Sequence, residues 1–158
     1  MNFEISDKVK YLNSMLCEID NMYQSLLLNK GLSDSEYVVL FSILELGEGC
    51  LQKDIANNGY INKKTTNSTI KKLEKNGLIT LKAGKYPNMP IYLTEEGKKY
   101  IEEHIIPIVD IQTDVMESVP DSDFENLVKT YSKYIRIFKD AIKKLLNESN
   151  QQGGVNNK

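Results

Sequence analysis

The chain has 158 residues, of which 41% are hydrophobic and 27% are charged, and this composition is typical of a single soluble domain with enough apolar residues for a core. No run approaches the roughly 20 apolar residues that span a bilayer, and the first residues lack the apolar stretch of a signal peptide, so we expect a cytoplasmic protein without a membrane partner. The net charge is −2, and the two cysteines and one histidine have no metal-ligand spacing, so no metal and no cofactor are expected.

The N-terminal part of the chain is predicted to form two helices. Apolar residues recur at helical spacing over residues 6–28, and Gly31 follows as a residue that can end a helix with a positive φ. The next helix is capped by Ser33, because Glu36 three residues later completes a capping box. Its apolar residues continue to Leu46, near which we expect it to end.

The central part is predicted to contain two short helices followed by two strands. The helices cover residues 51–57 and 63–76, and Asn62 is a good N-cap for the second. Two β-like runs, residues 78–81 and 90–93, are separated by a loop rich in Gly, Pro and Asn. Helix, turn, helix and a two-stranded wing in this order predict a winged helix-turn-helix, so the expected fold class is mainly α with a small β-hairpin.

The C-terminal part is predicted to be helical again. Thr94 caps a helix over residues 94–118, in which Pro107 should produce a kink or a split. A last helix over residues 121–147 carries a long apolar stripe, and a helix of this kind usually packs on another long helix. Residues 149–158 are polar and rich in Asn, Gln and Gly, which predicts a disordered tail.

Positive charge is concentrated in the predicted winged helix. Residues 51–93 contain eight lysines and two acidic residues, a net charge of +6, so the rest of the chain carries −8. A basic island in an acidic protein indicates contact with a nucleic acid, because lysines release counterions from phosphates. A solvated lysine-rich surface has the same composition, so charge alone does not decide between the two interpretations.

The second short helix is the candidate DNA-contacting element. Its apolar residues are few, and its remaining face carries short polar side chains between lysines, which suits base edges and phosphates in a major groove. Asn67 could pair with adenine and Thr65 could touch a thymine methyl group, although the same face would suit the wet side of an ordinary surface helix. The candidate DNA-binding residues are Gln52, Lys63, Lys64, Thr65, Asn67, Ser68, Lys71 and Lys72, with Lys82 and Lys85 in the wing.

The segment QKDIANNGYINKKTTNSTIKKLEKNGLI, followed after the wing by IYLTEEGKKYIEE, resembles the MarR (multiple antibiotic resistance regulator) family of bacterial repressors. LEKNGLI and YLTEEGKKY are the most specific parts. The resemblance implies an intertwined homodimer, with a dimerisation region at residues 1–32 and 95–148 and a DNA-binding region at residues 33–94. It also implies a pseudo-palindromic double-stranded DNA operator, with recognition helices in major grooves and wings at minor grooves.

The wing departs from the family pattern. The family usually has an Asp-x-Arg motif there, whereas this wing reads GKYPNMP and the only arginine of the chain is Arg136, in the last helix. A contact with the minor groove would then come from Lys82, Lys85 or Asn88, and lysine fits a narrow minor groove less well than arginine. We therefore expect weaker shape readout by the wing, or a wing with a different role.

The resemblance also implies a switch, usually a small, often aromatic ligand in a cleft between the dimerisation and DNA-binding lobes. The candidate lining residues are Tyr37, Phe41, His104 and Met116. Each of them is equally explained as part of the core. The position of Cys17 in the first helix is similar to that of the reactive cysteine of MarR-type hydroperoxide sensors. Glu18 and Asp20 disfavour a thiolate there, so a packing role is the alternative.

Two other classes of function are weighed against DNA binding. An enzyme would need a nucleophile with a base, or a carboxylate pair, and the sequence offers no candidate, so no enzyme activity is expected. A winged helix that binds only proteins is the other alternative. The basic island argues against this interpretation, and the absence of an arginine from the wing argues for it. The sequence favours a dimeric, sequence-specific DNA-binding transcriptional regulator, a ligand-responsive repressor, with the protein-interaction module and an oxidation-sensing regulator as alternatives.

Overall fold

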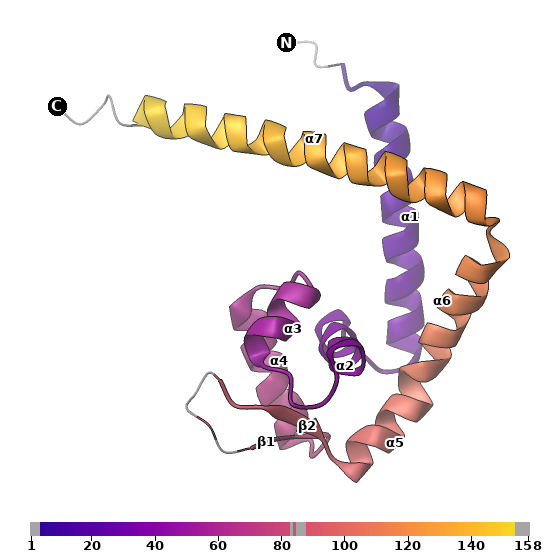
Figure 1. Ribbon diagram of the computed structural model, residues 1–158, viewed down its shortest axis with the longest axis vertical. Helices are drawn as coiled ribbons and strands as arrows, with labels where there is room; N and C mark the ends of the chain where they lie inside the picture. Colours follow the sequence, from indigo (N-terminus) through magenta and orange to yellow (C-terminus); the bar gives the residue numbers. More distant parts are fainter. Residues whose placement is uncertain (1–3, 83, 85–87, 154–158) are drawn as a thin grey trace. The chain divides into compact units, whose positions relative to one another are not determined.

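The computed structural model describes the backbone of residues 4–82, 84 and 88–153, and the side chains of these residues up to residue 148. The described part is mainly helical with one antiparallel two-stranded hairpin, which confirms the expected fold class (Figure 1). The chain divides into two compact units, Met1–Val109 and Asp110–Lys158, and each is described by itself.

The first two helices begin and end close to where the sequence predicts. α1 (Asp7–Asn29) is followed by Gly31, whose φ of 70° turns the chain, and α2 (Asp34–Leu46) comes next. The expected capping box is formed, because the Ser33 hydroxyl accepts from the Glu36 backbone N–H and the Glu36 carboxylate accepts from the Ser33 N–H.

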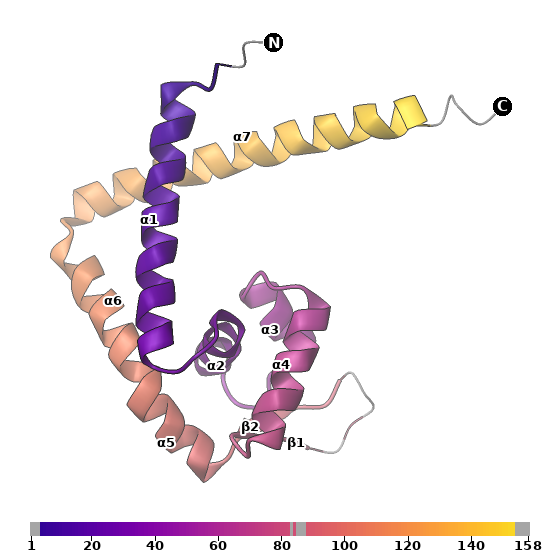
Figure 2. The same ribbon diagram turned by 180° about the vertical axis from the view of Figure 1, so that it is seen from behind.

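The winged helix-turn-helix occupies the middle of the first unit. α3 (Gln52–Asn58) and α4 (Lys63–Lys75) are the two short helices, and the hairpin strands are β1 (Ile79–Leu81) and β2 (Ile91–Leu93) (Figure 2). The Asn62 side chain accepts from the first turn of α4, as its N-cap position predicts.

The hairpin has one pairing that the sequence does not predict. In register, Ile79 of β1 lies opposite Leu93 of β2. The other edge of β2 pairs with the residues before α3, since the Gly49 N–H donates to the Ile91 carbonyl at 2.7 Å and the Ile91 N–H donates to the Cys50 carbonyl at 3.0 Å. These two hydrogen bonds join the base of the wing to the start of the helix-turn-helix.

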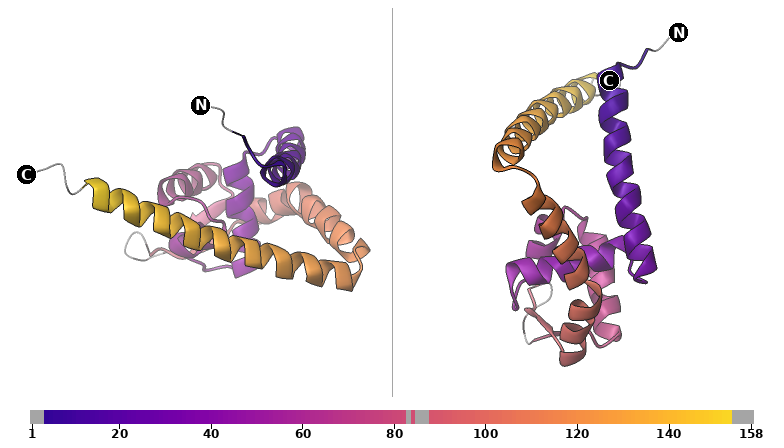
Figure 3. Two further views of the ribbon diagram at one scale, coloured as in Figure 1. Left: turned by 90° about the horizontal axis from the view of Figure 1, so that it is seen from above. Right: turned by 90° about the vertical axis from the view of Figure 1, so that its right-hand side faces the viewer.

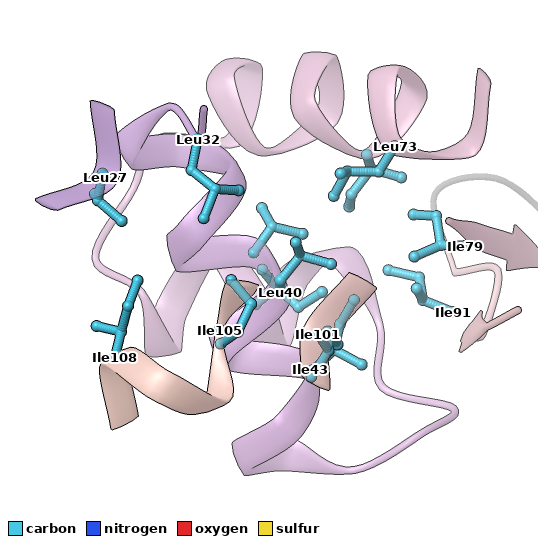
Figure 4. Packing of buried hydrophobic residues seen from close by; sticks show 13 residues of the cluster. Leu27, Leu32, Leu40, Ile43, Leu73, Ile79, Ile91, Ile101, Ile105 and Ile108 are labelled. Carbon is cyan, nitrogen blue, oxygen red and sulfur yellow. The ribbon is translucent and has the colours of Figure 1, made fainter. Parts of the chain in front are cut away.

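One hydrophobic core backs both α4 and the hairpin (Figure 4). Its centre is on α2, where Val39, Leu40 and Ile43 are at most 1% exposed. Around them lie Leu27, Leu32, Ile55, Ile70, Leu73, Ile79, Ile91, Ile101, Ile105 and Ile108. Because close packing tolerates little rotation of a helix, this core determines which face of α4 reaches solvent.

The helical segment after the hairpin is interrupted next to Pro107, where the sequence predicts a kink or a split. α5 (Glu95–His104) and α6 (Ile106–Ser118) are separated at Ile105. Pro107 lies in the first turn of α6, where its missing N–H removes no helical hydrogen bond. The sequence allowed a kink or a split, and the structure has a split.

The last helix is longer than predicted. α7 (Asp121–Gly153) is one continuous helix in both views of Figure 3, whereas the sequence predicts an end near Asn147 and a tail over residues 149–158. Residues 149–153, which lie within the predicted tail, continue the helix, and residues 154–158 lie outside the described residues. Adding a residue to a helix that has already begun costs much less than starting a new one, so polar composition alone does not end it.

Candidate nucleic-acid interface

The buried face of α4 defines the face that is open to other molecules. Thr66, Thr69, Ile70 and Leu73 are buried against the core. At 100° per residue, the opposite side of the helix carries Lys64, Ser68, Lys71 and Lys75, and all four are exposed. We call these four residues the α4 outer face. Three of them are among the sequence candidates, whereas Lys75, in the last turn, is not.

The N-terminal turn of α4 is held by hydrogen bonds. Asn62 accepts from the Thr65 N–H at 2.8 Å, and the Thr66 hydroxyl donates to the Asn62 carbonyl at 3.0 Å. Gln52, the first residue of α3, donates from its side-chain amide to the Lys63 carbonyl at 3.4 Å. Gln52 was predicted to contact DNA, and in this structure it joins the starts of the two helices.

A small cavity separates α4 from the hairpin. Its volume is about 100 Å³, and its lining residues are Gln52, Asn67, Ile70, Lys71, Glu74, Leu81, Met89 and Ile91. The cavity places Asn67 on the flank of α4 that faces the wing, where it is half-buried. Thr65 lies on the other flank and is also half-buried. The two residues predicted to read bases therefore lie at the margins of the α4 outer face.

The flank of α4 that faces α2 carries an ion pair. Lys72 Nζ lies 2.9 Å from Glu36 Oε1, and the Glu36 side chain is only 10% exposed. Burial alone would raise the pKa of the Glu36 carboxyl, but hydrogen bonds from Ser33 and Lys72 outweigh it and lower that pKa below its ordinary value. Lys72 was predicted as a DNA-contacting residue, and here its ammonium group is already paired.

The described part of the wing holds its lysine against an aromatic ring. Lys82 Nζ lies 4.0 Å from the centroid of the Tyr92 ring, which is a cation–π arrangement. The Lys82 backbone N–H donates to the Pro90 carbonyl at 3.0 Å and extends the hairpin beyond β1. Asn88 is exposed, and Lys85, the other wing candidate, lies outside the described residues.

The sequence of the helix-turn-helix and of the first strand of the wing matches a known protein family. Residues 32–83 match the model of the MarR family. This segment is a MarR family domain. The match covers α2, α3, α4 and β1 and confirms the resemblance of the helix-turn-helix segment to this family. No curated protein matches the chain.

Solved structures extend the likeness of fold beyond this domain. A MarR family regulator from Neisseria meningitidis, NMB1585, superposes with a TM-score of 0.76 at 20% identity, covering 88% of this chain and 99% of its own. BpsR from Bordetella bronchiseptica superposes with a TM-score of 0.63 at 18% identity, and the superposition covers 84% of this chain and 98% of BpsR. MarR from Staphylococcus aureus superposes with a TM-score of 0.65 at 16% identity, and the superposition covers 84% of this chain and 93% of that protein. The helices that flank the MarR family domain therefore belong to the shared fold.

The candidate ligand residues form two aromatic pairs in the first unit. Within the MarR family domain, the rings of Tyr37 and Phe41 stack with centroids 5.8 Å apart. On α5, His104 packs against Tyr100 with centroids 4.3 Å apart. Met116 is exposed and belongs to the second unit.

The two cysteines differ in environment. Cys17 is exposed on α1, in keeping with a position that other molecules can reach, and Cys50 is half-buried beside the core. Burial, together with the charge of Asp54, raises the pKa of the Cys50 thiol, so this residue is a poor nucleophile.

Two further observations concern the described residues as a whole. No three side chains of His, Cys, Asp or Glu among them come together in an arrangement that could hold a metal ion. None of the helices in this part of the chain combines the length and the apolar character needed to cross a membrane.

Proposed function

We propose that this protein is a homodimeric, sequence-specific DNA-binding transcriptional regulator that acts as a ligand-responsive repressor in the cytoplasm. The observation that carries the proposal is the α4 outer face, where three lysines surround Ser68 on the second helix of the helix-turn-helix in a MarR family domain. A helix of this size fits a major groove, its lysines can bind phosphates, and the short side chain at its centre lets the helix approach base edges.

Two features determine how α4 would present its side chains to DNA. The core holds the helix from behind, so the outer face is pre-organised and little conformational entropy is lost on binding. Asn67 and Thr65, at the margins, would reach bases only if the groove encloses the sides of the helix. We therefore assign Lys64, Lys71 and Lys75 to phosphates and Ser68 to the centre of the groove.

The second copy of the chain is proposed from apolar surface that the described residues do not cover. None of the side chains described from residue 110 to residue 148 is buried. Phe124, Tyr131 and Phe138 recur every seven residues on α7 and are 40% to 53% exposed. A stripe with this period is typical of a helix that packs on another helix. A second copy provides that helix and gives the dimer two α4 helices for a pseudo-palindromic operator.

The effector is proposed from the structural neighbours. The Staphylococcus aureus MarR structure is a complex with salicylate and kanamycin, and the DNA binding of BpsR is regulated by 6-hydroxynicotinic acid. We propose a small aromatic acid for this protein, with Tyr37, Phe41, His104 and Met116 as the residues to vary. A rise of melting temperature with salicylate that Phe41→Ala removes would support this site, and an unchanged rise would place the ligand elsewhere.

The experiment that tests DNA binding is selection of duplexes from a random pool, followed by affinity measurements across salt. We expect an inverted repeat with half-sites about one helical turn apart and an affinity that falls steeply with salt. Lys64→Gln with Lys71→Gln should lower the slope of log K against log salt by about 1.8, at roughly 0.9 for each lost phosphate contact.

A matched control removes equal charge far from α4 in the sequence. Lys129→Gln with Lys143→Gln on α7 should leave the slope unchanged. If the folded, dimeric protein enriches no duplex, the DNA-binding proposal is wrong, and a winged helix used for protein interaction becomes the better account.

A further inference from the structure

Three polar groups converge on the carboxylate of Glu36. Its Oε2 accepts from the Ser33 N–H at 3.2 Å and from the Ser33 hydroxyl at 2.5 Å, while its Oε1 lies 2.9 Å from Lys72 Nζ. One oxygen therefore completes the cap of α2, and the other binds α4. Both oxygens of this nearly buried carboxylate are satisfied within the protein.

Lys72 and Lys71 are neighbours in sequence but lie on different flanks of α4. Lys71 lines the cavity between α4 and the hairpin and belongs to the α4 outer face. Lys72 lies on the flank facing α2, where its ammonium group is bound to Glu36. A composition count treats the two lysines alike, whereas the structure gives them different partners.

We propose that Glu36 and Lys72 are a positioning pair that fixes α4 on the N-terminal end of α2, and that Lys72 does not contact phosphate in the DNA complex. This inference rests in part on the proposed function, because DNA binding is one of its two readouts. Breaking a pair of which one member is buried leaves that charge without compensation, so loss of Lys72 loosens α4 rather than removing a surface charge.

The surroundings of the pair favour the ionised carboxylate. Lys72 approaches from α4, Ser33 donates two hydrogen bonds from the cap, and Tyr100 approaches from α5. Burial, and then the negative charge of Glu36, raise the pKa of the Tyr100 phenol, so this group stays neutral at physiological pH. The only positive charge among these groups is that of Lys72.

The test compares Lys72→Met with Lys71→Met, which removes the same charge one residue away. Lys72→Met should lower the melting temperature by about 2–4 °C and weaken DNA binding without changing the salt slope. Lys71→Met should leave the melting temperature unchanged and lower the slope by about 0.9. Lys72→Arg keeps the ion pair and should restore both properties, which a purely steric role of lysine would not predict.

A double-mutant cycle examines the pair without DNA. Glu36→Gln and Lys72→Met should each lower the melting temperature, and together they should lower it by less than the sum, because both remove the same interaction. Additive shifts would refute the positioning pair, even if the wild-type protein bound no duplex and the proposed function had failed. A slope that Lys72→Met lowers as much as Lys71→Met does, with no change in melting temperature, would also refute it.

The pH dependence gives an independent readout. The folded-state pKa of Glu36 is below its ordinary value of 4.5, so its stabilising contribution is present above that pH and is lost as the pH falls through the folded-state pKa. The wild-type protein should therefore lose more stability below about pH 4.5 than Glu36→Gln does. Equal losses in the two proteins would contradict the role assigned to the carboxylate.

Discussion

At the scale of single residues, the turn between α3 and α4 carries strain that packing imposes. A Cβ atom on Gly59 would lie 2.3 Å from Val38 Cγ1, so this position requires glycine for close approach. The left-handed residue that ends α3 is therefore the next one, Tyr60, with a φ of 51° and a side chain that is 93% exposed. Glycine or asparagine is usual in that conformation, and a bulky residue there costs about 1 kcal/mol.

We predict opposite outcomes for substitutions at these two neighbouring positions. Tyr60→Asn should stabilise the protein by up to about 1 kcal/mol, because asparagine tolerates the left-handed conformation better. Gly59→Ala should destabilise it by about 1–3 kcal/mol through overpacking against α2. Thermal unfolding of both variants against the wild type checks the pair. A loss of stability in Tyr60→Asn would mean that the tyrosine ring makes a contact, in the dimer or with a ligand, worth more than the strain.

Residue-scale features differ in how far the sequence could predict them. The caps at Ser33, Asn62 and Thr94 were predicted and are present, because a cap depends on residues three or four apart in the chain. The bond from Lys72 to Glu36 joins two helices, and its existence depends on how far α4 is rotated on the core. Helical periodicity locates the buried face of a helix only to within about one residue. The sequence therefore could not predict that Lys72 faces α2 whereas Lys71 faces the hairpin.

At the scale of elements, the hairpin and α5 meet through a close backbone contact. A Cβ atom on Gly97, in the first turn of α5, would lie 1.9 Å from the Leu78 carbonyl oxygen. Thr94 caps α5 and also donates from its hydroxyl to the Gly77 carbonyl at 2.6 Å. Both residues lie in the YLTEEGKKY segment, which therefore joins α5 to the base of the hairpin.

This contact predicts that α5 and the base of the wing lose stability together. Gly97→Ala should destabilise the protein by about 1–3 kcal/mol, since the obstacle is backbone that cannot rotate away. Gly31→Ala is a useful comparison, because no described residue beyond its two chain neighbours comes within 4 Å of a Cβ there and only its positive φ opposes the change. Denaturant unfolding measures both variants, and faster amide exchange at β1 should accompany Gly97→Ala alone. An unchanged exchange rate at β1 would show that α5 and the hairpin are not coupled.

Element boundaries followed the sequence where a single residue determines them. Pro107 and Gly31 mark a helix break and a turn, and both were predicted. The end of α7 was predicted too early, because polar composition does not stop a growing helix. The pairing of Gly49 and Cys50 with β2 was missed altogether. It involves too few residues to produce an alternating pattern, and its partner is about 40 residues away in the chain.

At the scale of the whole molecule, the apolar stripe of α7 is the surface on which the proposed dimer depends. Tyr134 lies at its centre, stacked between Tyr131 and Phe138 with ring centroids 5.9 and 5.8 Å apart. Tyr134→Asp would bury a carboxylate in the proposed interface, where it has no counter-ion, and such a charge costs several kcal/mol for each copy. We therefore expect this variant to be monomeric in sedimentation equilibrium and to lose operator binding, because a single half-site holds a monomer only weakly.

The matched control is Arg136→Asp, two residues further along α7. At 100° per residue it lies on the other side of the helix from Tyr131 and Phe138, so it should leave the dimer intact despite a larger change of charge. A dimeric Tyr134→Asp protein would place the interface away from the α7 stripe. A monomeric Arg136→Asp protein would show that the polar face of α7 is the one that meets the second copy, and the heptad spacing would then have no structural role.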